Sequence, residues 1–228
     1  MTTVSEPAPR TPKAEQTRRA IVDAAMRLFR EGGYDRTTMR AIADEAGVSL
    51  GNAYYYFSSK EHLIQAYYGR VLEEHTAAAA VVLAGETSFA ARLRGVLAAW
   101  LDVAAPYQEF AGKFFKNAAE PSSPLSPFSP ESAGPREESI ALYRQVVEGS
   151  DLKVAKALRE ELPELLWLLQ MGVVLFWVYD ASEGQRRTRT LVDGVAPMVD
   201  RLARMTRLPV VRGVVDDLVG LLHTLRAG

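Results

Sequence analysis

The sequence contains no cysteine among its 228 residues. This absence excludes a disulfide framework, a thiolate zinc site, an iron–sulfur cluster and a cysteine nucleophile. Charge of one sign is not in excess either, since 27 Lys and Arg face 28 Asp and Glu. A formal net charge of −1 gives no general attraction to nucleic acid or to anionic membranes. Taken alone, this balance argues mildly against a DNA-binding protein.

Long hydrophobic runs are scarce as well. The first dozen residues contain Glu6 and three prolines, with no apolar run that a signal peptide could use. The most apolar stretch, 165–179, is 15 residues long and is interrupted by Gln170 and Gly172. Because a membrane span needs about 20 apolar residues, we expect a buried helix there, no membrane partner and a cytoplasmic protein.

The chain also lacks the alternating pattern of β-strands, and the predicted fold class is all-α. A hydrophobic content of 48% with 24% charged residues is that of a soluble globular protein. Apolar residues recur instead at helical spacing. The expected helices are 13–32, 39–46, 49–55, 60–84, 89–105, 110–119, 136–148, 152–162, 163–183, 186–206 and 210–226.

Local signals predict where several of these elements begin and end. Ser58-x-x-Glu61 matches a capping box and is expected to open the long helix that follows. Asp151 is the expected cap of helix 152–162, and Pro163 its stop. Residues 121–135 hold five prolines and five serines, so we expect a mobile loop. That loop either controls access to a ligand pocket or is an unimportant insertion.

Residues 37–63 predict two short helices joined by a tight turn and followed by a long helix. Ala43, Ala46 and Gly47 are small enough for the two short helices to cross closely, as in a helix-turn-helix. The second helix, 49–55, is too short to be stable alone. Its exposed positions carry leucine, asparagine and tyrosine in place of lysine and glutamate. Such a surface indicates contact with a partner.

One spaced motif runs through this segment: Thr37-Thr38, Ile42-Ala43, Ala46-Gly47-Val48-Ser49, Gly51, Tyr54, Tyr56-Phe57 and Lys60-Glu61. The motif closely resembles that of the TetR (tetracycline-repressor-like) family of bacterial transcriptional regulators, and the match covers roughly residues 14–65. The one departure is Ala53, where the family usually has a larger aliphatic residue. We expect looser packing beneath the second short helix as a result.

Residues 1–12 are expected to be a flexible tail from their composition. The resemblance implies a helix-turn-helix DNA-binding domain (13–60) and a helical ligand-binding and dimerisation domain (61–228). It implies a ligand-responsive regulator, in the first instance a repressor, that binds a palindromic double-stranded DNA operator as a homodimer. A small-molecule effector would release it. Helices 163–183 and 186–206 are the expected dimer surface, half of an intermolecular four-helix bundle. The alternative is that both helices pack inside the monomer.

The resemblance also assigns DNA-binding residues. Helix 49–55 would enter the major groove, where Asn52 would read adenine and Leu50 would touch a thymine methyl. Other members would contact phosphates. The full expected set is Arg36, Thr38, Arg40, Ser49, Leu50, Gly51, Asn52, Tyr54, Tyr55, Tyr56 and Lys60.

Several of these residues have a structural alternative. Tyr54 and Phe57 are equally well interpreted as core residues, and Arg36 as a solvated turn residue. Arg10 and Lys13 either reach DNA from the tail or have no role. Helix 49–55 contains no Arg, Lys, Gln or Glu, so we expect DNA shape and backbone contacts to supply much of the selectivity.

The expected effector contacts are mostly aromatic, which suits an apolar or aromatic molecule. They are Tyr67, His75, Trp100, Tyr107, Phe110, Phe114, Asn117, Tyr143, Trp167, Gln170 and Phe176, with Gln108 as a further polar candidate. For each of them, ordinary core or surface packing is the alternative.

The rival functions are an enzyme, a helical scaffold that does not bind an operator, and an activator of the same family. No H-E-x-x-H, G-x-S-x-G, P-loop or G-x-G-x-x-G motif occurs, so no enzyme, metal or cofactor is expected. Residues 1–60 carry a net charge of +2 and residues 61–228 a net charge of −3. This modest basic excess predicts weak non-specific DNA affinity and a shallow salt dependence.

Overall fold

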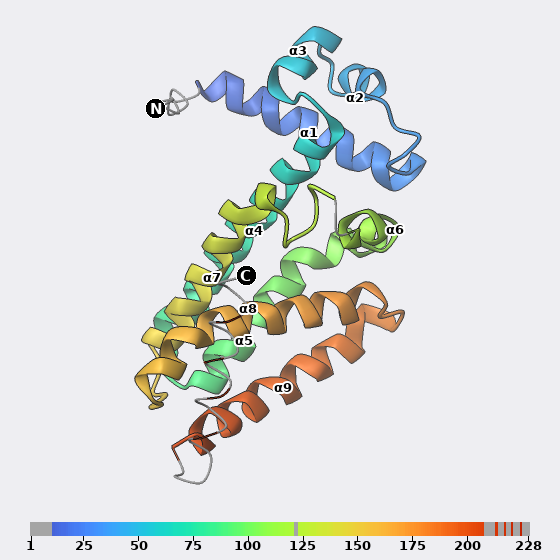
Figure 1. The fold of residues 1–228 in the computed structure, drawn as a ribbon. Helices are drawn as coiled ribbons and strands as arrows, with labels where there is room; N and C mark the ends of the chain where they lie inside the picture. The colour runs from blue at the N-terminus through green and yellow to red at the C-terminus, as the bar shows by residue number, and fades with distance from the viewer. Residues whose placement is uncertain are drawn as a thin grey trace. The chain divides into compact units, whose positions relative to one another are not determined.

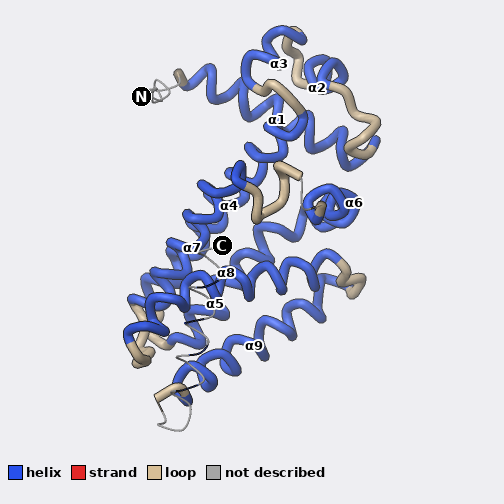
Figure 2. The backbone as a smooth tube through the Cα atoms, in the orientation of Figure 1, coloured by secondary structure: helices blue, strands red, loops and turns tan. Residues whose placement is uncertain are grey.

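The computed structural model describes residues 11–120 and 123–207, together with 213, 217, 220 and 224, and leaves out the side chains of 113, 114, 116 and 117. Within these ranges the chain consists of helices and short connections and contains no β-strand (Figures 1 and 2), which confirms the all-α prediction. The expected helix 210–226 and most of the expected tail lie outside the described residues. The chain divides into two compact units, Met1–Tyr68 and Gly69–Gly228.

The first unit contains three helices and the start of a fourth: α1 (Pro12–Gly32), α2 (Met39–Glu45), α3 (Leu50–Tyr56) and α4 (Lys60–Gly85). Thr11, Thr38 and Ser49 precede the first three helices, and each side-chain oxygen accepts a hydrogen bond from a backbone N–H of the following turn. Between α2 and α3, Gly47 has a φ of +67°, a conformation that side chains rarely adopt. The tight turn of the expected helix-turn-helix is therefore formed by glycine.

The start of α4 differs from the expected capping box. Ser59, not Ser58, is the cap, and its Oγ accepts a hydrogen bond from the N–H of His62 at 3.4 Å. The hydroxyl of Ser58 instead lies 2.5 Å from Nδ1 of His62. Glu61 does not close a capping box because its carboxylate accepts a hydrogen bond from the hydroxyl of Tyr34 at 2.8 Å. The carboxylate of Glu61 thus has a tertiary partner in Tyr34 beside a local one in Ser59.

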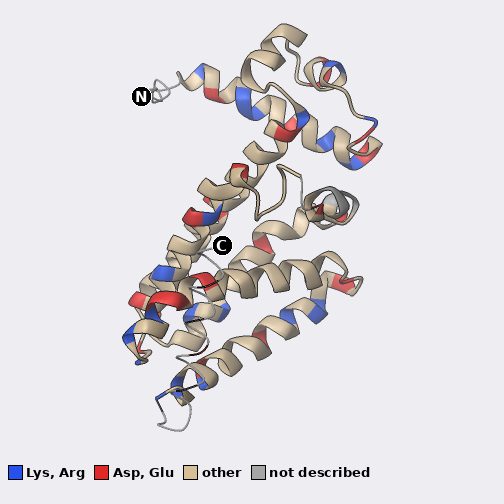
Figure 3. Ribbon diagram, viewed as in Figure 1, with Lys and Arg blue, Asp and Glu red and all other residues tan. Residues whose placement is uncertain are grey.

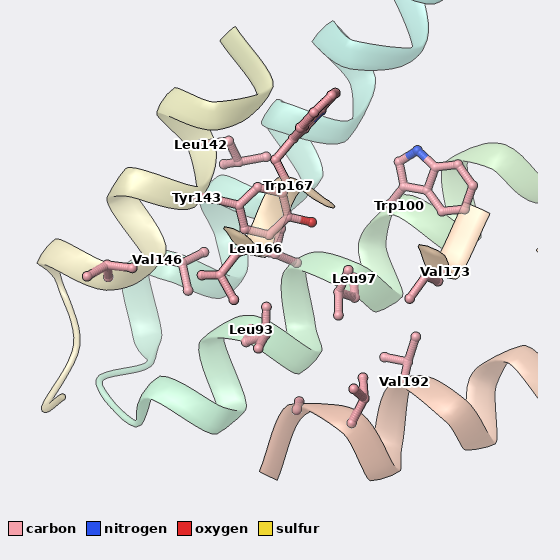
Figure 4. Packing of buried hydrophobic residues seen from close by; sticks show 14 of the residues in the cluster. Leu93, Leu97, Trp100, Leu142, Tyr143, Val146, Leu166, Trp167, Val173 and Val192 are labelled. Atoms are coloured by element: carbon pink, nitrogen blue, oxygen red, sulfur yellow. The ribbon is translucent and has the colours of Figure 1, made fainter. Parts of the chain in front are cut away.

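The second unit contains the remainder of α4 and, up to residue 207, the helices α5 (Phe89–Ala104), α6 (Gln108–Ala119), α7 (Ala133–Glu148), α8 (Lys156–Val178) and α9 (Arg186–Met205). Helix α5 packs against α7 and α9, while α8 contacts α6, α7 and α9. Figure 4 shows Leu97 of α5, Tyr143 of α7 and Val173 of α8 among the side chains that meet in this core. Three-residue 3₁₀ turns lie at Ala105–Tyr107, Pro130–Ser132 and Glu183–Gln185.

Helix α8 corrects the prediction of two helices separated at Pro163. The helix is continuous from Lys156 to Val178, and Pro163 lies inside it. Leu158, Leu162 and Leu166 are all buried in the same core, so a continuous helix buries a stripe that a break would divide. This burial outweighs the cost of an interior proline, about 3 kcal/mol. The helix is long and apolar enough to span a membrane by length and composition alone, a test that core helices of soluble proteins also pass.

Asp151 caps a different helix from the one expected. It precedes α8 by several residues, and its carboxylate accepts a hydrogen bond from the N–H of Phe89 at 3.0 Å, at the start of α5. The same oxygen accepts a second hydrogen bond, from Arg204 of α9, at 2.8 Å. The hydrogen bond from Phe89, together with Arg204, holds the pKa of Asp151 below its ordinary value.

The segment rich in proline and serine is shorter and more regular than expected. Residues 133–135 already belong to α7. Over 123–132 the backbone N–H groups of Ser126, Ser129 and Ser132 each donate to the carbonyl of the serine three residues earlier. A proline follows each of Ser123, Ser126 and Ser129, which is the position that proline favours in a turn. The repeat therefore builds successive hydrogen-bonded turns.

Arg92 of α5 joins the ends of two other helices. Its guanidinium donates to the carbonyls of Leu83 and Glu86, at and just after the end of α4, and to those of Gln145 and Val146 near the end of α7. Carbonyls in the last turn of a helix lack intrahelical partners and carry partial negative charge. One buried cation therefore caps both helices.

We predict that Arg92→Met destabilises the protein by about 2–4 kcal/mol, because four carbonyls, one buried and three partly buried, lose a charged donor. Arg92→Lys restores the charge but reaches fewer carbonyls, so a smaller loss is expected. Urea denaturation followed by circular dichroism measures both. The control is Arg94→Met on the exposed side of the same helix, for which a change within about 0.5 kcal/mol is expected. Equal losses at the two positions would contradict the assignment.

Candidate nucleic-acid interface

Helix α3 presents most of its residues to solvent. Tyr55 is 82% exposed and Asn52 is exposed beside it, whereas Ala53 is fully buried. Ala53 is the departure from the family motif noted above. Its small side chain lies where α3 packs against α2. The outward face carries neither acidic nor basic side chains, and α3 shows neither charge colour in Figure 3.

The structure separates the two aromatic residues that allowed a core interpretation. Tyr54 is 49% exposed, so the core alternative is wrong for it. Phe57 is 3% exposed and is a core residue, with the guanidinium of Arg18 lying 5.2 Å from its ring centre. Of these two motif residues, Tyr54 is therefore exposed to solvent and Phe57 is buried in the core.

The expected DNA-binding residues all belong to the first unit, but they are exposed to different degrees. The exposed members are Arg36, Thr38, Arg40, Ser49, Gly51, Asn52, Tyr54 and Tyr55, and the half-buried members are Leu50, Tyr56 and Lys60. Among the exposed members, Arg36 donates through Nε to the carbonyl of Gly32 at 2.8 Å and so closes the end of α1. Its role as a turn residue is therefore visible in the structure.

Lys60 has an intramolecular position that the motif did not indicate. Its ammonium donates to the carbonyl of Tyr34 at 2.7 Å and lies 4.3 Å from the centre of the Tyr34 ring. The hydroxyl of Tyr34 in turn donates to Glu61. These three residues fasten the turn between α1 and α2 to the first turn of α4. The phosphate contact expected of Lys60 stays a prediction.

The electrostatics of this cluster follow from its partial burial. Burial alone would raise the pKa of Glu61, but hydrogen bonds from Ser59 and Tyr34, with the charge of Lys60, hold it below its ordinary value. Burial and the adjacent carboxylate raise the pKa of the Tyr34 hydroxyl. The tyrosine therefore stays a neutral donor to an ionised glutamate at neutral pH.

A second ion pair orients α2 in the same unit. Arg27 of α1 donates through Nε to Glu45 at 3.1 Å, with a second guanidinium nitrogen 3.0 Å from the same oxygen. Sequence reasoning missed both this pair and Tyr34 as positioning residues. The contacts join residues 18 and 27 positions apart, and no local pattern marks such pairs.

The expected effector contacts fall into groups. Tyr67 lies in the first unit and the others in the second. The buried ones are Tyr67, His75, Trp100, Phe110, Tyr143, Trp167 and Gln170; Tyr107 is half-buried, Phe176 is exposed, and the side chains of Phe114 and Asn117 lie outside the described residues.

The polar candidates whose side chains the structure describes already have partners within the chain. The hydroxyl of Tyr143 donates to Gln170 at 2.8 Å, and Nε2 of His75 lies 3.0 Å from the carbonyl of Val96. Burial lowers the pKa of His75, although the hydrogen bond to Val96 opposes this shift. Gln108 donates to the carbonyls at the end of α8 and so acts as its cap. These contacts are the ones expected if the residues serve packing within the chain, which is the alternative to effector binding.

Trp177 was not among the candidates, although its indole N–H is buried. Its side chain is 2% exposed, and its indole Nε1 has no hydrogen-bond partner among the described residues. Its ring packs edge-to-face against Trp100 with centres 5.2 Å apart. The sequence shows only a tryptophan in an apolar helix, and its missing partner is visible only after folding.

Comparison with known proteins gives matches over both units. Residues 21–67 match the family described as "Bacterial regulatory proteins, tetR family", and residues 92–221, more than half of the chain, match "Tetracyclin repressor-like, C-terminal domain". The transcriptional repressor KstR of Mycobacterium tuberculosis is 46% identical over 55 residues, which cover 24% of this chain and 25% of KstR. The chain thus aligns with only about a quarter of that relative's length.

Solved structures extend the similarity of fold to most of the chain. A TetR transcriptional regulator from Nitrosomonas europaea is similar with a TM-score of 0.62 and 22% identity, covering 80% of this chain and 97% of that one. The repressor FadR of Thermus thermophilus, solved in complex with lauroyl-CoA, is similar with a TM-score of 0.55 and 23% identity, covering 82% and 94%. At these identities the comparison shows the fold.

We predict that Tyr34→Phe destabilises the protein by about 1 kcal/mol at pH 7, because the Glu61 carboxylate loses a donor. The pKa of Glu61 is depressed in the folded state, so its stabilising contribution is present above its unfolded pKa, about 4.3, and is lost as pH falls through the folded pKa. The difference between variant and parent should therefore shrink in acid. Urea denaturation at pH 7 and pH 3.5 measures it. Tyr54→Phe, on an exposed tyrosine, should change stability little at either pH.

Proposed function

Since the chain belongs to the TetR family of bacterial regulatory proteins, we propose that it is a ligand-responsive transcriptional repressor of the cytoplasm. It binds a palindromic double-stranded DNA operator as a homodimer, and a small effector releases it. The observation that carries this proposal is the outward face of α3, which has hydrogen-bonding and aromatic groups but no charged ones. We propose no catalytic activity and no metal or cofactor.

Two features of α3 support major-groove binding. The cap provided by Ser49 and the buried Ala53 hold the helix in place, which leaves Asn52 exposed and able to read adenine. A side chain at Gly51 would meet no atom within 4 Å, so the fold itself does not require glycine there. Close approach of the DNA backbone supplies a reason why this position carries no side chain.

Contacts to phosphate and to DNA shape account for the rest of the interface. Arg40 and Thr38 are exposed at the start of α2, beside α3. With no Arg, Lys, Gln or Glu on α3, base-edge hydrogen bonds are few, and selectivity comes largely from the deformability and groove width of the operator. The small number of basic contacts also explains why a nearly neutral chain binds DNA: a dimer presents the same contacts twice.

The dimer surface is the apolar face that α8 and α9 leave uncovered. On α9, Val192, Val195 and Ala196 point into the core, while other large apolar residues remain exposed. The exposed ones on the two helices are Leu168, Leu175, Phe176, Met198, Leu202 and Met205. Exposed apolar residues on two adjacent helices fit a second copy of the chain, which would close a four-helix bundle.

Effector and operator oppose each other by linkage. Both recognition helices of a dimer bind only if their spacing matches one turn of DNA, about 34 Å. An effector that binds the second unit in a conformation with a different spacing weakens operator binding, and the operator weakens effector binding by the same free energy. The aromatic side chains of the second unit favour a largely apolar or aromatic effector.

Two other functions have different consequences for DNA binding. A helical scaffold would not shift DNA at low salt. An activator would bind the operator equally well, because its DNA-reading unit has the same residues. A gel shift excludes the scaffold, and a reporter gene under the operator then tells repressor from activator by the sign of its response.

We predict that the protein shifts the DNA upstream of its own gene at low salt and that salt weakens the complex with a shallow slope. Arg40→Ala should lower the magnitude of the log–log salt slope by about two, one phosphate for each copy. Arg144→Ala, at an exposed position of α7, should leave the salt slope unchanged. Absence of any shift at low salt would contradict the proposed function.

The gel shift, together with a binding-site selection, also tests whether Asn52 reads a base. Asn52→Ala should lower operator affinity by about 10-fold or more, since one bidentate contact discriminates by about 1–3 kcal/mol, and should relax the preference for adenine in a binding-site selection. If neither affinity nor preference changes, Asn52 does not read DNA.

For the dimer, we predict that Leu202→Glu halves the mass measured by light scattering and lowers operator affinity by about a hundredfold, because two half-sites no longer bind as one unit. Leu202 is 56% exposed within one chain, so the variant should remain folded. Gln145→Glu makes the same change of charge at an exposed position of α7 and should leave the measured mass unaltered. A dimer that survives Leu202→Glu would place the interface elsewhere.

A further inference from the structure

Helix α4 is fastened at its beginning within the first unit. Lys60 and Glu61 are bound to Tyr34 as described above. Leu63 and Ile64, one turn further on, are completely buried. This first part of α4 therefore moves with the DNA-reading unit.

The later part of α4 is fastened to α5 within the second unit. His75 is buried and bonded to the carbonyl of Val96. Farther along, Arg92 donates to the carbonyl of Leu83 at 2.8 Å. Between these contacts the helices approach so closely that a Cβ on Gly95 would collide with a methyl of Val82. The second part of α4 therefore moves with the core of the second unit.

Gly69 lies between the two fastened parts, inside the 26-residue helix. The boundary between the two units falls between Tyr68 and this glycine. A Cβ at Gly69 would meet no atom within 4 Å, so packing within the chain does not require glycine. Glycine is nevertheless among the residues that most weaken a helix, because it leaves the unfolded backbone the greatest freedom.

We propose that Gly69 is a hinge at which α4 bends, so that the two units change orientation without losing the contacts at either end. Backbone hydrogen bonds open most readily at a glycine, and no neighbouring side chain fills the space beside this one. The hinge itself does not depend on operator binding, since it is a property of the chain alone.

Gly69→Ala tests the hinge. Since an added Cβ meets open space, the variant should fold normally, and its helix should open about four- to fivefold less often at this point. Hydrogen exchange of residues 69–73 should slow by that factor. Spin labels at Asp44→Cys and Glu138→Cys, one in each unit, should show a narrower distance distribution than in the parent. The absence of native cysteine makes these the only labelling sites.

Two controls separate a hinge from general stiffening of helices. Gly134→Ala adds a methyl group in an equally open position on α7 and should leave the distribution between the two units unchanged. A second label pair, Thr76→Cys with Glu138→Cys, uses two exposed positions that lie wholly within the second unit and should be insensitive to Gly69→Ala. Dilution with unlabelled chain keeps distances between copies out of the measurement.

Unchanged width between Asp44 and Glu138 in Gly69→Ala would overturn the proposal, even if hydrogen exchange slowed, because the opening would then not reorient the units. Equal narrowing in Gly134→Ala would overturn it as well. All measurements are made without DNA or effector. A failed gel shift therefore leaves the hinge standing, and a failed hinge leaves operator binding untouched.

Discussion

Helix α4 has to bury a different set of side chains in each of two units with one continuous backbone. Its first turn is tied to the turn after α1 through Tyr34, and its last turn is capped by Arg92. Each tie is a hydrogen bond to a charged group, and such bonds are stronger than neutral ones. Each end of the helix is therefore held within its own unit.

The surface proposed to bind DNA depends on how the two short helices α2 and α3 are held in place. Helices α2 and α3 have seven residues each, too few to be stable by themselves. Their positions come from caps at Thr38 and Ser49 and from the buried methyl of Ala53. The exposed residues of α3 are not needed to hold the helix in place, so Asn52 and Tyr55 are available to contact a partner.

The second unit shows where local signals mislead. Proline ends helices in isolation, yet Pro163 lies inside α8 because the leucines on both sides enter one core. Asp151 is a good cap by composition, but its carboxylate caps α5, a helix distant in sequence. The first unit has a parallel case, since Ser58 and Glu61 have capping-box spacing but Glu61 finds Tyr34 instead. In each case contacts with residues distant in sequence override what the local pattern predicts.

By itself the sequence determined the all-α class and the helix-turn-helix with glycine at its turn, because helical periodicity, caps and turn residues act over a few positions. Of the four residues expected to be exposed on α3, Asn52 and Tyr55 are, whereas Leu50 and Tyr56 are half-buried. Only the tertiary structure decided that Arg92 caps two helices, that Tyr34 holds α4, and that Trp177 has a buried N–H with no partner among the described residues. These depend on residues that come together only when the helices pack. The physical reason is that burial and distant hydrogen bonds contribute more free energy than local propensity does, and the sequence does not show which distant groups will meet.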